Sequence, residues 1–223
     1  MPPTGDRALE APPIPARRDE ALTARVTEAF ALPGVRAGSG LAWHGDRLVV
    51  VQDDALAVAL VDPRTRAVTP FPLAGTGEAL PKASKPDFEA VFEAADGRLV
   101  LIGSGSAPTR RRWARLDLAT GDVALDDMGP LYDAVAAALG GPPNLEGVVR
   151  DGERLRLFHR ADGAGHGRNV VLDVAPSPAP RVVATRFACL RRSPPIFTVP
   201  LLLSPCIGLA FCARAHASPG TCR

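Results

Sequence analysis

The sequence is informative first through what it lacks. The first 188 of its 223 residues contain no cysteine, and the four cysteines follow at Cys189, Cys206, Cys212 and Cys222. Such a cysteine-free stretch is typical of a reducing compartment. The N-terminus, Met1–Asp6, has neither the basic start nor the apolar run of a secretory signal. We therefore expect a cytoplasmic protein.

Acidic residues are absent from the C-terminal part of the chain. All 24 of them lie at or before Asp173, whereas residues 174–223 contain six arginines and no Asp, Glu, Lys, Asn or Gln. Residues 1–173 carry 20 basic and 24 acidic side chains, a net charge of −4, and the remainder carries +6. The overall charge of +2 predicts no basic surface, so we do not expect nucleic acid as a partner.

Residues 188–223 have three interpretations. A frame-shifted or otherwise aberrant end explains the loss of acids and lysines together with the sudden cysteines, and it is the favoured one. A membrane segment is the second: Ile196–Ala213 holds 18 residues without a charge after Arg191 and Arg192, although two prolines weaken it as a helix. A metal or disulfide cluster is the third, but the cysteines form no C-x-x-C pair. We expect no membrane contact unless 196–213 is a real segment.

Familiar catalytic motifs are also missing. The sequence has no G-x-S-x-G elbow, and its four histidines are too scattered for an H-E-x-x-H zinc site. Gly103–Ser106 is glycine-rich, but no Lys-Ser/Thr pair follows it, so a phosphate loop is not expected. Whether the protein is an enzyme is therefore left open by its motifs.

One passage, in contrast, occurs three times. It covers Ser39–Ala42, Glu89–Phe92 and Glu146–Val149, and each copy is followed, after a polar turn, by Arg-Leu and a β-rich run. The copies lie 50 and 57 positions apart. A repeated unit of this length made of short strands is typical of propeller blades. We predict an all-β fold, a partial β-propeller of about three four-stranded blades; a β-sandwich is the alternative, but it does not explain the repetition.

The strands of each blade follow from turn residues and apolar runs. Residues 1–23 are expected to be a flexible leader, 24–187 the partial propeller and 188–223 a separate tail. Pro130–Leu139 is predicted as a short inserted helix, with proline near its start and Gly140-Gly141 after its end. The predicted strands are Ala24–Leu32, then Gly40–Trp43, Arg47–Gln52, Ala55–Val61 and Ala67–Pro72, then Glu89–Phe92, Arg98–Gly103, Trp113–Leu118 and Val123–Leu125, then Glu146–Val149, Arg154–His159, Asn169–Val174 and Arg181–Phe187.

The wording of the repeats resembles a group of bacterial β-propeller families. The matching residues are Ser39–Ala42, Asp87–Ala90 and Asn144–Gly147, with Gly103–Ser106 and Phe158–Arg160 as the strand ends that follow. One member of the group is the family named for the esterase-like activity of phytase, and uncharacterised relatives open their blades with D-L-E-G. The resemblance covers about residues 24–187. Three blades are fewer than the four to eight of whole propellers, so we expect this chain to be truncated, the front part of a larger protein.

The repeat alignment also predicts where chemistry can sit. If the first strand of each repeat is innermost, the second strand returns beside its start. Residues at both places then meet at one mouth of the channel. The candidates are Glu89, Glu146 and His159 as catalytic residues, Ser104, Ser106, Asn144 and Arg160 as substrate-binding residues, and Asp53 and Asp87 as metal ligands.

Two functions are compatible with this set. The resemblance implies metal-assisted hydrolysis or binding of small esters or phosphoesters, with calcium as the expected cofactor because it prefers carboxylate oxygens. Arg160 and Arg110–Arg112 are candidates to receive an anionic group. The alternative is a non-catalytic propeller scaffold for a ligand or protein, in which the acids form structural ion pairs such as Glu146 with Arg160 or Glu89 with Lys85.

Overall fold

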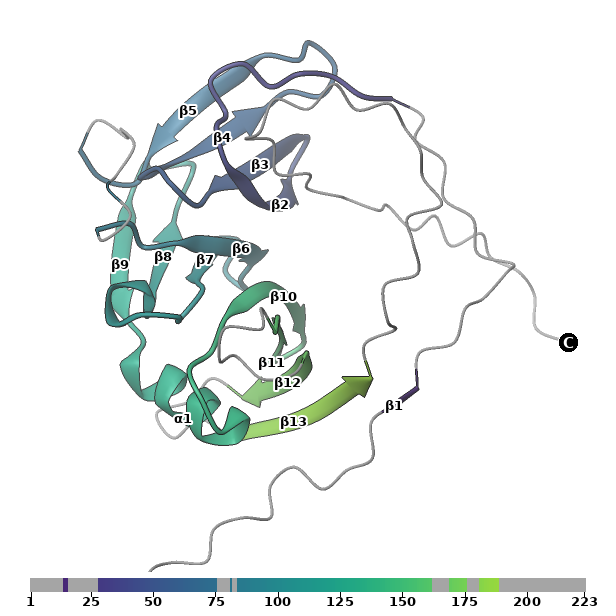
Figure 1. The fold of residues 1–223 in the computed structure, drawn as a ribbon. Helices are drawn as coiled ribbons and strands as arrows, with labels where there is room; N and C mark the ends of the chain where they lie inside the picture. The colour runs from purple at the N-terminus through teal and green to yellow at the C-terminus, as the bar shows by residue number, and fades with distance from the viewer. Residues whose placement is uncertain are drawn as a thin grey trace, which may run out of the picture.

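The computed structural model describes residues 28–75, 81, 84–161, 169–175 and 181–188, together with a two-residue strand, β1 (Ile14–Pro15). Its other strands form three antiparallel four-stranded blades arranged as an open arc (Figure 1). Blade 1 consists of β2 (Gly38–His44), β3 (Arg47–Gln52), β4 (Ala57–Val61) and β5 (Val68–Pro72); blade 2 of β6 (Phe88–Glu93), β7 (Leu99–Gly103), β8 (Arg112–Leu116) and β9 (Val123–Asp127); blade 3 of β10 (Leu145–Asp151), β11 (Arg154–His159), β12 (Val170–Ala175) and β13 (Arg181–Ala188). The predicted partial propeller is confirmed.

The strands form where apolar residues alternate or run together between turns. β11 alternates, with Leu155 and Leu157 buried and Arg154 and Arg156 exposed, because only one of its faces packs on another blade. All five residues of β7 are buried, because blade 2 lies between two neighbours. The hairpin that opens each blade turns at a glycine with positive φ, at Gly45, Gly97 and Gly152.

The first strand of each blade lies innermost, as predicted. In Figure 1, β2, β6 and β10 line the central space and β5, β9 and β13 lie outside. One apolar core joins blades 1 and 2 and another joins blades 2 and 3. The first contains Val49, Val51, Val58, Phe88, Leu99 and Leu101, and the second contains Val100, Ile102, Trp113, Leu155, Leu157 and Leu172.

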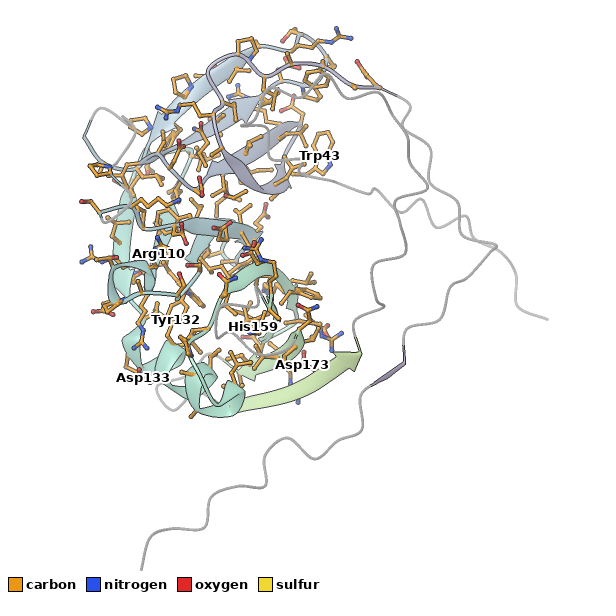
Figure 2. All side chains as sticks on the ribbon, viewed as in Figure 1. Trp43, Arg110, Tyr132, Asp133, His159 and Asp173 are labelled. Atoms are coloured by element: carbon orange, nitrogen blue, oxygen red, sulfur yellow. The ribbon has the colours of Figure 1, made fainter. Side chains whose placement is uncertain are left out.

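The inserted helix, α1 (Gly129–Leu139), is also confirmed. Pro130 stands in its first turn, and Gly140 ends it with a φ of 74°. Its buried side chains Leu131, Tyr132 and Val135 join the core between blades 2 and 3. The Tyr132 hydroxyl donates a 2.6 Å hydrogen bond to the Gly103 carbonyl, which anchors the end of β7 (Figure 2).

One strand prediction was wrong. Residues 28–32, the described part of the predicted strand Ala24–Leu32, form no strand. Their side chains Phe30 and Leu32 instead pack on the outer face of blade 1. This contact suits an irregular segment, because apolar side chains can cover a sheet without strand pairing. The alternation of apolar residues that includes Phe30 and Leu32 therefore results from their burial against blade 1, and not from hydrogen bonding to another strand.

Two described segments near the ends of the chain belong to blade 3. β1 pairs in parallel with β13, so the predicted leader includes residues that extend blade 3. Of the predicted tail, Ala188 ends β13, and the apolar segment 196–213 and all four cysteines lie outside the described residues. Among the residues that the structure describes, no helix has the length and apolar character needed to cross a membrane.

Candidate functional site

The aligned positions of the repeat lie at one rim of the inner strands. In each blade, the residue that follows the second strand donates a backbone hydrogen bond to the carbonyl of the residue that precedes the first strand. Asp53 N donates to Ala37 O at 3.0 Å, Ser104 N to Asp87 O at 2.9 Å and Arg160 N to Asn144 O at 3.0 Å. The structure thus places Asp53, Ser104 and Arg160 at equivalent points, as their alignment in the sequence predicted.

The position that carries an acid in the second and third repeats, and a serine in the first, is a β-bulge in every blade. The register of the first two strands shifts between Gly38 and Gly40, between Phe88 and Ala90, and between Leu145 and Gly147. The extra residues are therefore Ser39, Glu89 and Glu146, one in each blade. A bulge leaves its residue outside the regular pairing and redirects its side chain, which is why bulges recur beside functional sites.

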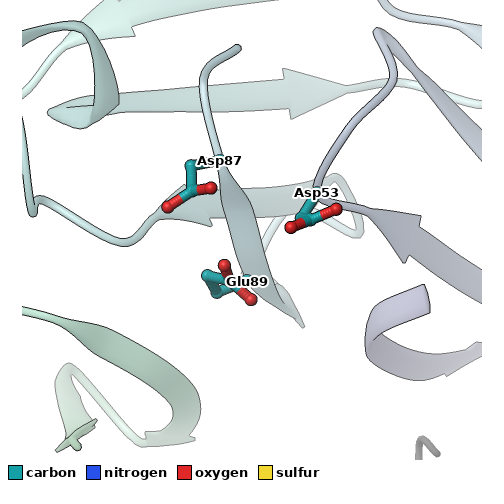
Figure 3. Close-up of side chains that lie close together, drawn as sticks. All are labelled: Asp53, Asp87 and Glu89. Carbon is teal, nitrogen blue, oxygen red and sulfur yellow. The ribbon is translucent and has the colours of Figure 1, made fainter. Parts of the chain in front are cut away.

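Three carboxylates converge at this rim between blades 1 and 2. Asp53 follows β3, Asp87 precedes β6 and Glu89 is the bulge residue of β6. One carboxylate oxygen from each lies within 4.8 Å of the others (Figure 3). Oxygen ligands of this kind suit a hard divalent cation.

Two cations from this chain already contact the cluster. The Lys85 ammonium lies 2.8 Å from Asp53 Oδ2 and 3.0 Å from Asp87 Oδ1. Arg110 contacts Asp87 Oδ2 at 2.9 Å. Lys85 therefore joins the two aspartates and does not form the ion pair with Glu89 that the sequence suggested.

Burial and hydrogen bonding act in opposite directions on Lys85. Burial lowers the pKa of its ammonium, but hydrogen bonds to Asp53 and Asp87 and their negative charges outweigh that effect. The net result is a pKa above the usual value of a lysine. Lys85 therefore stays charged at neutral pH and serves as an internal counter-ion.

Asp87 is held rigidly. Its backbone has a φ of 54°, a conformation that aspartate tolerates better than most residues. The Ser104 hydroxyl donates to Asp87 Oδ2 at 2.6 Å, and Ser104 Oγ also lies 2.8 Å from Ser106 Oγ. Arg110 bridges Asp87 and Ser106, at 2.9 Å from each. Ser104 and Ser106, predicted to bind substrate, thus form a network around this buried aspartate.

Glu89 is the most perturbed acid of the rim. Burial and then repulsion from Glu146, Asp87 and Asp53 raise its pKa to about 8, despite a small opposing effect of Lys85. At pH 7 the Glu89 carboxyl is therefore mainly protonated. With Glu89 neutral, the three remaining carboxylates of Asp53, Asp87 and Glu146 face the three cations of Lys85, Arg110 and Arg160.

The third blade contributes an ion pair and two polar contacts. Arg160 lies 2.9 Å from Glu146, as one of the structural pairs considered from the sequence. Burial raises the pKa of Glu146, and the opposing effect of Arg160 does not cancel it. His159 is buried, and its Nδ1 accepts the backbone N–H of Asn144 at 3.0 Å. The Asn144 amide donates to the Arg160 carbonyl at 3.3 Å.

Sequence reasoning did not find the partner of the aspartates. Lys85 stands two residues before Asp87, a spacing that carries no motif. Arg110 was expected to receive an anionic ligand, and it instead binds Asp87 and Ser106. The available signal was a pair of lysines just before the second repeat, Lys82 and Lys85, the only lysines of the sequence. A flexible lysine side chain can reach several acids, and only the fold selects among them.

The comparison with protein families is clear. Residues 34–194 match the family described as a family of unknown function, DUF6929. The chain belongs to the DUF6929 family. A comparison with curated proteins finds no match. Membership of this family therefore assigns no activity to the chain. The family that matches is not the esterase-like phytase family suggested by the blade openings.

Solved structures similar to this DUF6929 member resemble it only distantly. YCF48 bound to a D1 peptide is 13 % identical, with a TM-score of 0.39, covering 67 % of this chain and 39 % of its own. A mitotic checkpoint complex is 11 % identical, with a TM-score of 0.41, and the match covers 81 % of this chain and 47 % of that structure's chain. The Cps50 (Swd1) β-propeller domain of Myceliophteria thermophila is 13 % identical, with a TM-score of 0.37, and the match covers 71 % of this chain and 41 % of that chain. The chain thus spans less than half the length of each of these structures.

Proposed function

We propose that the chain is a ligand-binding β-propeller whose rim holds a divalent cation, best matched by calcium, between blades 1 and 2. The observation that carries the proposal is the convergence of Asp53, Asp87 and Glu89, whose ligand oxygens lie within 4.8 Å of one another. Calcium takes six to eight oxygen ligands in a flexible geometry, so backbone carbonyls and water would complete its shell.

Calcium must replace charges that the site already holds. Lys85 contacts two of the three carboxylates, and Glu89 carries a proton at neutral pH. Binding therefore requires the Lys85 ammonium to move away and the Glu89 proton to leave. Because metal ligands bind in their deprotonated form, calcium affinity should rise as the pH increases through about 8.

Calcium titration by isothermal calorimetry tests the proposal. Asp53→Asn and Glu89→Gln should each weaken binding by roughly tenfold or more, because each removes a charged ligand. Lys85→Met should strengthen binding, because it removes the competing internal cation. Asp126→Asn is the matched control, since Asp126 lies on the outer strand β9 and pairs with Arg115.

Two results would contradict the calcium proposal. One is the absence of binding at millimolar calcium to both the natural chain and the Lys85→Met variant. The other is binding that is equally strong in the natural chain, Asp53→Asn and Asp126→Asn. Circular dichroism of each variant separates lost binding from lost folding.

A second candidate function is hydrolysis of a small ester or phosphoester. The observation that favours it is the Glu89 pKa of about 8, close to the working pH of a general acid or base. The resemblance of the blade openings to the esterase-like phytase family supports the same chemistry. Hydrolysis of p-nitrophenyl acetate and p-nitrophenyl phosphate should then change near pH 8 and be lost in Glu89→Gln. An unchanged rate in that variant would exclude this role.

A further inference from the structure

The rim opposite the carboxylate cluster holds a pocket between blades 2 and 3. Asp87 precedes β6, and the pocket lies at the other end of that strand, where β6 and β10 are neighbours (Figure 1). Its volume is about 140 Å³, and residues of both blades line it. The pocket is therefore separate from the site described above.

The walls of this pocket are apolar and aromatic. Phe92 and Trp113 pack edge to face, with their ring centroids 6.1 Å apart and an angle of 84° between the ring planes. Leu155 of blade 3 adds to the apolar lining. An apolar cavity of about 150 Å³ can hold a benzene molecule. The pocket therefore has room for one phenyl or isobutyl group.

The corresponding place between blades 1 and 2 is bridged by side chains. Glu93 and Arg150 are equivalent residues of β6 and β10, because each pairs with the leucine near the start of the strand that follows. Glu93 Oε2 lies 3.0 Å from Nδ1 of His44 on blade 1. In blade 2 the position of His44 is taken by Ala94, whose methyl group cannot reach across to Arg150. The pocket thus occurs where a bridge between blades is missing.

Two charged side chains of this pocket are left without a partner. Arg150 and Glu153 line the pocket and are exposed, and neither side chain forms an ion pair or hydrogen bond with any residue that the structure describes. Arg150 lies on the face of blade 3 that meets blade 2, because it pairs with the buried Leu155. Glu153 lies in the turn of the same hairpin. One cation and one anion therefore stand beside an apolar pocket.

We propose that this pocket binds a free α-amino acid with an apolar side chain, such as phenylalanine or leucine. The Arg150 guanidinium would receive the carboxylate, and the Glu153 carboxylate would receive the ammonium group. The apolar side chain would lie against Phe92, Trp113 and Leu155, out of water. A free amino acid carries both charges beside its apolar group, whereas the first residue of a peptide lacks the carboxylate and the last residue lacks the ammonium group.

Calorimetric titration of the full chain with L-phenylalanine and L-leucine tests this proposal. Each should bind as one molecule per chain, with a dissociation constant in the millimolar range or below. N-acetyl-phenylalanine lacks the ammonium group and phenylalanine amide lacks the carboxylate, so each should bind at least about tenfold more weakly than phenylalanine. Glycine has no apolar side chain and should not bind at millimolar concentration.

Substitutions locate the binding. Arg150→Gln and Glu153→Gln should each weaken phenylalanine binding by about tenfold or more, because each removes a charged partner. Arg154→Gln is the matched control, since Arg154 belongs to the same hairpin but faces away from blade 2. Ala94→Leu should abolish binding by filling the pocket, whereas Ala124→Leu, on the outer strand β9, should have no effect.

Tryptophan fluorescence gives a second measurement of the same event. Trp43 and Trp113 are the two tryptophans of the chain, so in Trp43→Phe the signal comes from the pocket alone. Phenylalanine should change this signal to saturation. The change should persist when Asp53→Asn is added, because Asp53 lies at the opposite rim.

Three results would overturn the proposal. The first is no binding of either amino acid at millimolar concentration. The second is equal binding of phenylalanine by the natural chain, Arg150→Gln and Ala94→Leu, each shown by circular dichroism to be folded. The third is N-acetyl-phenylalanine bound as tightly as phenylalanine, which would mean a site for the C-terminus of a peptide.

Discussion

At the scale of single residues, the acids of the rim can lie close together because neighbouring cations or a bound proton balance their charges. The acids of Asp53 and Asp87 are neutralised by Lys85 and Arg110, and Glu89 avoids charge by holding its proton. Glu89 is thus the least compensated ionisable group in the cluster. Its titration should control both the stability of the fold and the affinity of the site for a cation.

Glu89→Gln should remove a pH-dependent loss of stability. Because the pKa of Glu89 is about 8 in the folded chain and near 4.5 when unfolded, the folded state binds more protons between these values. Stability therefore falls as the pH rises from about 4.5 through about 8. At pH 9 the variant should exceed the natural chain by about 2 kcal/mol, with allowance for partial solvent screening.

Urea denaturation at pH 5 and at pH 9 measures this difference. The gain should be present at pH 9 and small at pH 5, where Glu89 is protonated in the folded state. Asp126→Asn, remote from the rim, should show no such gain at pH 9. A Glu89→Gln variant with the same stability as the natural chain at pH 9 would mean that Glu89 is ionised there without cost.

At the scale of strands, Gly40 allows the inner strands β2 and β6 to pack closely. A Cβ added at Gly40 would lie 2.9 Å from the Ala90 Cα and 3.0 Å from the Glu89 carbonyl oxygen, both on the backbone of β6. Gly40→Ala should therefore push β2 from β6 and destabilise the fold by roughly 1–3 kcal/mol. Thermal unfolding followed by circular dichroism measures the loss.

Gly147→Ala is the control for that substitution. Gly147 holds the same place in the third repeat, but its added Cβ would first meet the Phe158 side chain, at 3.3 Å. A side chain half-exposed to solvent can move aside, and alanine also reduces the freedom of the unfolded chain. Gly147→Ala should be neutral or slightly stabilising. Equal losses in both variants would show that strand geometry, and not backbone contact, requires glycine here.

The strands could be predicted from the sequence because the three copies of the repeat place equivalent residues at the same positions of each blade. β3 and β11 have the predicted bounds, and most other strands differ by a few residues at their ends. The alignment of Asp53, Ser104 and Arg160 followed from the same repetition. The bulge at Glu89 was not predictable, because one additional unpaired residue leaves the apolar pattern intact. The partners of Lys85 depend on contacts between blades, which no local pattern encodes.

At the scale of the whole molecule, the three blades differ in how many neighbours they have. Blade 2 packs on both sides, and every residue of β7 is buried. β11 packs on one side, with Arg156 and Phe158 exposed on the other. Local opening should therefore need less free energy in blade 3 than in blade 2.

Hydrogen exchange should report this difference. In dilute protein, amides of β7 should exchange at least about tenfold more slowly than those of β11, which corresponds to about 1.4 kcal/mol. Equal protection of both strands would mean that the face of blade 3 that carries Arg156 and Phe158 does not lower the stability of this blade.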